Sequence, residues 1–324
     1  MFTLTATVEY IVIALACALL YGLCTFKILG ALQQAGYNGK KYAAWTHRRG
    51  NMVYSRFILL AFLTALAMLV LGICFSFAGA LAGYIALIPI PLFAALYCVA
   101  DKRALKVPLV STARANRIYL LNVLVIAVAA FVLGAAGNAV SYYCYTLPEN
   151  ADWEILSHLR YLPLALLPVL LPVLLRVANL LEKPFSYAKN KKFLARAREK
   201  LHAAPCVKIG ITGSFGKTSV KNFLAAILSV RYRVLATPES FNTPLGIARA
   251  VDGENLADYD IFIAEMGARN KGDIAELCEL VSPDHCMITG ICPQHVESFG
   301  GIESIIAARG EILAGMKKGG FAGV

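Results

Sequence analysis

Charged residues are scarce in this sequence. Asp, Glu, Lys and Arg make up only 16% of its 324 residues, whereas 58% are hydrophobic. A typical soluble protein carries about a quarter of its residues as charged groups. The composition therefore excludes a chain that is soluble throughout, and we expect part of it to lie in a lipid bilayer.

Paired cysteine motifs are also missing. The nine cysteines are scattered along the chain, and no two of them form a Cys-x-x-Cys pair. This pattern argues against a structural zinc site and against a disulfide framework, and it favours reduced thiols that serve as small apolar residues. We expect the soluble part of the chain to occupy a reducing compartment.

Acidic residues are few in the first two thirds of the chain. There are 20 Lys and Arg against 7 Asp and Glu before Val207, and 11 against 13 from Val207 onward. The basic excess thus falls in the hydrophobic part, where it favours membrane orientation over a nucleic-acid-binding face. We expect no nucleic-acid partner.

Five apolar stretches approach the roughly 20 residues that a membrane-spanning helix needs. Lys and Arg cluster in the connections after the first and third stretches and again after the fifth. By the positive-inside rule, these segments are cytoplasmic and the N-terminus is outside the cell. The expected protein is a multi-pass protein of the plasma membrane. Its predicted spans are Leu4–Phe26, Phe57–Ala78, Leu81–Ala100, Ile118–Tyr145 and Leu159–Leu181.

The predicted membrane domain, residues 1–181, is followed by a basic linker helix over residues 182–206. Two basic stretches, Lys27–Arg56 and Ser186–His202, mix cations with aromatic or helically spaced apolar residues. Each stretch either binds anionic lipid at the inner leaflet or simply supplies the charge that sets the topology.

Residues 207–324 alternate between strand and helix patterns, which predicts an α/β domain with a parallel, doubly wound sheet. Lys317–Val324 resembles a turn that enters a further strand, so we expect the chain to stop inside this domain. After a first strand from Val207, the predicted strands are Arg233–Ala236, Ile261–Ala264 and Cys286–Ile291, and the predicted helices are Pro244–Val251, Gly272–Val281 and Ile302–Met316.

A glycine-rich loop joins the first of these strands to a helix. Its glycines let backbone N–H groups turn inward, and the helix N-terminus adds partial positive charge, so the loop suits a polyphosphate. The alternative is an ordinary turn with a solvated lysine; Ile211 stands where the common motif has glycine. The residues that we expect to bind the nucleotide are Thr212, Gly213, Ser214, Phe215, Gly216, Lys217, Thr218 and Ser219.

Two residues at strand ends are candidate metal ligands. Glu265 ends the apolar strand Ile261–Ala264, and His295 follows the strand that ends near Ile291. A carboxylate at the tip of a strand beside a phosphate-binding loop is well placed to hold Mg²⁺. The alternatives are a surface glutamate and an ordinary loop histidine.

Four ordered blocks, TGSFGKTS from Thr212, NTPLG from Asn242, EMGARNKGDI from Glu265 and the stretch Thr289–Glu311, resemble the central ATP-binding domain of the Mur ligases. The likeness is strongest to the type that adds D-alanyl-D-alanine to the peptidoglycan precursor. It implies an ATP-dependent ligase that activates a carboxylate as an acyl phosphate and joins it to an amine.

The resemblance implies roles for individual residues. Gly213, Gly216 and Lys217 would hold the β- and γ-phosphates of ATP, and Thr218 one Mg²⁺. A second Mg²⁺ would be held by Glu265 and His295, while Asn242 and Thr243 would lie near the acceptor substrate.

Arg309 stands where the family usually carries a lysine that reacts with CO₂ to form a carbamate. Arginine keeps its positive charge and does not form that carbamate. Either Arg309 contacts the γ-phosphate in place of the second metal, or the second metal site is lost and with it much of the activity.

The resemblance leaves the substrates open. The family begins with a soluble domain that grips a nucleotide-linked precursor, and this chain has five predicted spans there instead. We expect a peptidoglycan precursor, nucleotide-linked or lipid-linked, and an amino acid or D-alanyl-D-alanine as partners, beside the lipid bilayer. One alternative is a catalytically impaired membrane scaffold that senses ATP. Another is a transporter, which has less support because the Ser-Gly-Gly-Gln run of ABC proteins is absent.

Overall fold

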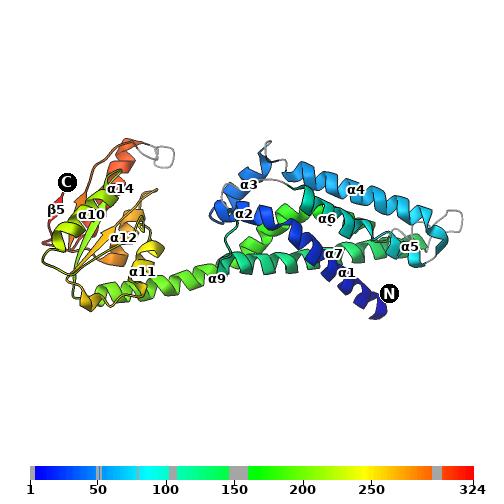
Figure 1. Ribbon diagram of the computed structural model, residues 1–324, viewed down its shortest axis with the longest axis horizontal. Helices are drawn as coiled ribbons and strands as arrows, with labels where there is room; N and C mark the ends of the chain where they lie inside the picture. Colours follow the sequence, from blue (N-terminus) through cyan, green and yellow to red (C-terminus); the bar gives the residue numbers. More distant parts are fainter. Residues whose placement is uncertain are drawn as a thin grey trace. The chain divides into compact units, whose positions relative to one another are not determined.

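The structure of the chain is a computed structural model, and it divides into two compact units, Met1–Ser186 and Tyr187–Val324. Figure 1 shows helices alone in the first unit and a sheet with helices in the second. The structure describes residues 4–48, 51, 53–78, 80–101, 108–145, 160–293 and 301–324.

Within the described residues of the first unit, the regular secondary structure is all helical. Five segments are long and apolar enough to cross a membrane, judged by length and composition. Many of their large apolar side chains, such as Leu19, Phe62 and Leu120, lie on the outside of the unit. The elements are α1 (Leu4–Cys24), α2 (Phe26–Gln34), α3 (Gly39–His47), α4 (Val53–Cys74), η2 (Ser76–Ala78), α5 (Ala80–Ile85), α6 (Pro89–Ala100), α7 (Ala113–Tyr145), η3 (Leu162–Leu166) and α9 (Leu167–Ala203), of which the part from Tyr187 onward belongs to the second unit.

Two of the predicted spans differ in detail from the structure. The predicted third span coincides with the candidate span Leu81–Ala100, but within it α5 ends at Ile85 and α6 begins at Pro89, since proline is favoured in the first turn of a helix. The predicted fifth span and linker helix are not separate, since α9 runs unbroken through Pro172 and Pro184.

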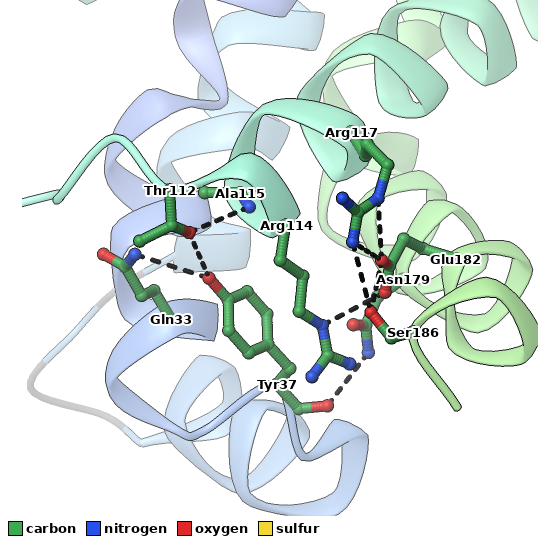
Figure 2. Close-up of polar contacts among 9 residues, drawn as sticks. All are labelled: Gln33, Tyr37, Thr112, Arg114, Ala115, Arg117, Asn179, Glu182 and Ser186. Carbon is green, nitrogen blue, oxygen red and sulfur yellow. Dashed lines mark hydrogen bonds and ion pairs between the residues drawn. The ribbon is translucent and has the colours of Figure 1, made fainter. Parts of the chain in front are cut away.

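Buried carboxylates hold pairs of cations in the first unit. Glu182 on α9 is 1% exposed, and its oxygens lie 3.0 Å from Arg114 Nε and 2.7 Å from Arg117 Nη2 on α7 (Figure 2). Asp101 at the end of α6 is paired in the same way with Arg56 and Lys27. Each carboxylate therefore ties together segments that are far apart in the sequence.

The second unit contains a five-stranded sheet in the order β2-β3-β1-β4-β5, with every neighbouring pair parallel. The predicted parallel α/β fold is confirmed, although β4 is shorter than the predicted strand and ends at Ile288. The strands are β1 (Val207–Thr212), β2 (Val234–Ala236), β3 (Ile261–Glu265), β4 (His285–Ile288) and β5 (Ala322–Gly323), and the helices are α10 (Lys217–Leu228), α11 (Pro244–Asp252), η4 (Leu256–Asp258), α12 (Asp273–Val281) and α14 (Ile302–Gly315).

Helices cover both faces of this sheet. Ile261 and Ile263 of β3 pack with α10, whereas the alternate residues Phe262 and Ala264 belong to a larger cluster with α11, α12, α14 and the last turns of α9. This alternation follows from the two-residue period of a strand. The carboxyl ends of β1 and β3 meet at one edge, with Ile211 beside Glu265.

Candidate functional site

The glycine-rich loop connects β1 to α10. Gly213 has φ 148° and Gly216 has φ 76°, and conformations of this kind favour glycine. Gly216 is the N-cap of α10, and no side chain caps the helix there. The first N–H groups of α10 thus face the loop with the partial positive charge of the helix end, which suits an anion.

The end of β4 fixes the shape of this loop. Ser214 N donates to Gly290 O at 2.7 Å, and the Thr289 hydroxyl donates to Phe215 O at 2.5 Å. The ring of Phe215 lies against Gly290, where a Cβ would come within 2.8 Å of it. Ser219, in contrast, is exposed on α10.

The Lys217 ammonium folds back onto the loop. Its Nζ donates to Gly213 O at 2.7 Å and lies 3.3 Å from Ser214 O. Burial lowers the pKa of Lys217, and the charge of Arg309 lowers it further, while Glu265 acts in the opposite direction. The ammonium therefore lies directly at the glycine loop, beside both a second cation and a carboxylate.

Glu265 is buried at the end of β3 and is not a surface residue. Its Oε2 accepts a hydrogen bond from the Thr218 hydroxyl at 2.9 Å and lies 3.2 Å from Lys221 Nζ. Its Oε1 accepts from Asn242 Nδ2 at 3.0 Å, and its backbone N donates to Thr237 Oγ1. Two segments, α10 and the connection between β2 and α11, thus hold one carboxylate in place. Lys221 was missed by the sequence analysis, although its spacing four residues after Lys217 places both on one side of α10.

Thr218 and Glu265 fit a magnesium ion. Both present hard oxygen atoms, and Mg²⁺ is usually bound by one or two protein oxygens together with phosphates and water. Among the described residues there is no group of three or more His, Cys, Asp and Glu side chains that would form an all-protein cage. The predicted ligand His295 lies outside the described residues.

Arg309 reaches the same region from α14. It is 2% exposed; Nη1 lies 3.4 Å from Thr212 Oγ1 and Nη2 lies 3.3 Å from Ala268 O. Its Nε has no hydrogen-bond partner within the described part of the chain. Burial lowers the pKa of this guanidinium, and Asp273 partly opposes the effect.

A cavity of about 310 Å³ brings the predicted residues of the loop, the Asn242 block and α14 together. Three cations and two carboxylates lie on its wall, so it suits an anionic group that also offers hydrogen-bond donors. The lining residues are Lys217, Asn242, Thr243, Pro244, Gly267, Ala268, Arg269, Asp273, Glu276 and Arg309.

In comparisons with known proteins, most of the second unit matches a family model. Residues 211–324 match the Mur ligase middle domain. The chain is 34% identical over 118 residues to the UDP-N-acetylmuramoyl-tripeptide--D-alanyl-D-alanine ligase of Escherichia coli. This match covers 36% of this chain and 26% of that protein. It is 40% identical over 114 residues to the Bacillus subtilis enzyme of the same name, covering 35% of this chain and 24% of that protein.

Solved structures of such ligases also match. The MurF ligase from Thermotoga maritima in complex with ADP is 33% identical, with a TM-score of 0.38, over 41% of this chain and 31% of that chain. The chain spans about a quarter of the length of the curated relatives it matches. The similarity to the Mur ligases thus lies in residues 211–324, which match their middle domain.

Proposed function

We propose that this protein is a membrane-anchored, ATP-dependent ligase that joins a carboxylate to an amine during synthesis of a peptidoglycan precursor. The observation that carries the proposal is the arrangement of Lys217, Thr218, Glu265 and Arg309 at the carboxyl ends of parallel strands. This edge is where ligands bind in open α/β sheets. The ligase names of the Escherichia coli and Bacillus subtilis relatives support the choice of this chemistry.

The first step in this proposal is phosphoryl transfer. The substrate carboxylate attacks the γ-phosphorus of ATP, and the bond between that phosphorus and the oxygen of the β-phosphate breaks. ADP departs, and the substrate becomes an acyl phosphate. Negative charge builds up on the transferring group, and preorganised cations stabilise it. Lys217 is placed to hold the β- and γ-phosphates, and Arg309 offers a planar guanidinium suited to phosphate oxygens.

Magnesium held by Thr218 and Glu265 would neutralise further charge on the phosphates. Asn242 donates to Glu265 and lines the cavity with Thr243, so the carboxylate and the proposed acceptor-binding residues are fixed to one another. The predicted second metal ligand, His295, stays a proposal.

The second step is attack of the amine on the acyl carbon. The new C–N bond forms, the C–O bond to phosphate breaks, and inorganic phosphate leaves. The proposed amine is an amino acid or D-alanyl-D-alanine, and the proposed acceptor is a muropeptide linked to a nucleotide or to a lipid. The Escherichia coli and Bacillus subtilis relatives carry D-alanyl-D-alanine in their names.

The first unit provides the proposed membrane anchor. Its five apolar segments support multi-pass insertion. The distribution of Lys and Arg supports an outside N-terminus and a cytoplasmic nucleotide unit.

The proposal is tested with the purified full-length protein in lipid nanodiscs. It is incubated with Mg-ATP, D-alanyl-D-alanine and either the nucleotide-linked or the lipid-linked precursor, and products are measured by mass spectrometry. We expect amide and ADP in equal amounts, formed only when all components are present. Nucleotide binding without amide from either precursor would instead favour the scaffold, and absence of nucleotide binding would contradict both.

A further inference from the structure

Lys221 occupies an unusual position for a lysine. Every residue of α10 is described, and among them Lys221 alone is buried. Its side chain is 1% exposed and lies 3.2 Å from the carboxylate of Glu265, which is 2% exposed. Lysine is almost never fully buried unless it is paired, so the ion pair explains why the helix tolerates a cation here.

A second contact links Lys221 to the turn after β2. Its Nζ also donates to the backbone oxygen of Glu239. Glu239 has φ 43°, in the left-handed region that residues other than glycine seldom adopt. The residue with this left-handed backbone conformation, Glu239, is thus the one whose carbonyl accepts the hydrogen bond from the Lys221 ammonium.

The same turn leads directly to Asn242. Asn242 N donates to Ser240 O at 2.8 Å, and the Asn242 side chain donates to Glu265 Oε1 at 3.0 Å. Lys221 and Asn242 thus contact the two oxygens of one carboxylate. Asn242 belongs to the segment from Glu239 to Asn242, and Lys221 donates to the first carbonyl of that segment. The result is a closed set of contacts between α10, the end of β3 and this segment.

We propose that Lys221 is a positioning residue that orients the Glu265 carboxylate for magnesium and ties it to the segment carrying Asn242 and Thr243. This inference rests on the proposed function, because it assigns Glu265 to the metal. The Oε2 atom of Glu265 faces both Thr218 and Lys221, so a metal between Thr218 and Glu265 meets a carboxylate whose position the ammonium has already set. Groups that orient a metal ligand in this way typically change metal affinity by about 10- to 100-fold when they are removed.

The test uses binding and needs no turnover. The full chain in nanodiscs is titrated with a fluorescent ATP analogue, first in EDTA and then at increasing Mg²⁺. For Lys221→Met, we expect the Mg²⁺ concentration at half-effect to rise about 10- to 100-fold. Affinity for the metal-free nucleotide, which depends on the glycine loop and Lys217, should stay within about threefold of the unmodified protein.

Lys208→Met is the matched control. Lys208 is the other large buried lysine of this unit, 2% exposed, and its Nζ donates to Leu201 O at 3.0 Å, away from the metal ligands. We expect this variant to lose thermal stability but to keep the Mg²⁺ dependence. An unchanged Mg²⁺ dependence in folded Lys221→Met, or an equal shift in Lys208→Met, would overturn the inference.

A second variant covers the case in which Lys221→Met does not fold. Removing one partner of a buried ion pair leaves an uncompensated charge, so Lys221→Met combined with Glu265→Gln should recover a cooperative thermal transition. Failure of the double variant to recover it would overturn the inference as well. If the unmodified protein shows no Mg²⁺-dependent nucleotide binding, the proposed function fails. If the unmodified protein shows this binding and Lys221→Met leaves it unchanged, only the inference about Lys221 fails.

Discussion

The Thr289 hydroxyl fills the space that a side chain on Gly213 would need. A Cβ added to Gly213 would overlap Thr289 Oγ1, which itself donates to Phe215 O in the same loop. The glycine loop therefore depends on the residue that follows β4 as well as on its own sequence.

Gly213→Ala is expected to distort the loop and to weaken nucleotide binding by at least tenfold. Besides the overlap with Thr289, the backbone at φ 148° costs a non-glycine residue about 1 to 3 kcal/mol. Gly253→Ala is the control, because Gly253 has φ −90° and no atom within 4 Å of an added Cβ. Calorimetric titration with Mg-ATP measures both variants, and equal affinities would contradict the account of the loop.

Much of this site follows from short-range patterns in the sequence. An apolar strand, two glycines and a Lys-Thr pair at a helix start predict the loop between β1 and α10. An apolar strand that ends in a carboxylate predicts the position of Glu265, because neighbouring parallel strands end at one edge of the sheet.

The cation contacts do not follow from such patterns. Lys221 is buried only because Glu265 and Glu239, from later parts of the chain, meet it. The contacts of Arg309 with Thr212 and Ala268 join three segments whose spacing in the sequence carries no signal. In the first unit, hydropathy averaged over 20 residues concealed the break before Pro89.

Arg309→Lys tests the two readings of this position. A lysine has a single charged nitrogen and cannot reach both Thr212 Oγ1 and Ala268 O as the guanidinium does. We expect ligase kcat/KM to fall about 10- to 100-fold, the range for losing a charge-assisted hydrogen bond, with or without bicarbonate. An increase in activity on adding bicarbonate would show instead that a carbamate serves this site better than the arginine.

Glu182→Gln should destabilise the first unit. The substitution leaves Arg114 and Arg117 without the carboxylate that lies 3.0 and 2.7 Å from them (Figure 2). Breaking a buried ion pair costs on the order of 3 kcal/mol, so thermal unfolding in detergent should begin at a clearly lower temperature. Glu199→Gln, at an exposed position of the same helix, is the control and should leave the transition unchanged.

Membrane orientation is tested by labelling intact cells with an impermeant thiol reagent. Single cysteines are introduced as Thr7→Cys, Glu149→Cys and Asp258→Cys after the nine native cysteines have been removed. The positive-inside rule predicts labelling of the first two and not of the third. The reverse pattern would place the nucleotide unit outside the cell and contradict the proposed location.

The most direct test of the central proposal, that the second unit binds Mg-ATP through its glycine loop, is calorimetric titration of the purified chain and of Lys217→Ala. The Lys217 ammonium donates a hydrogen bond to Gly213 O at 2.7 Å, beside the proposed phosphate site. Its removal should weaken Mg-ATP binding about 10- to 100-fold, corresponding to the 1.5 to 3 kcal/mol typical of a charge-assisted hydrogen bond. Mg-ATP affinity that is the same in Lys217→Ala as in the unmodified protein would contradict the proposal.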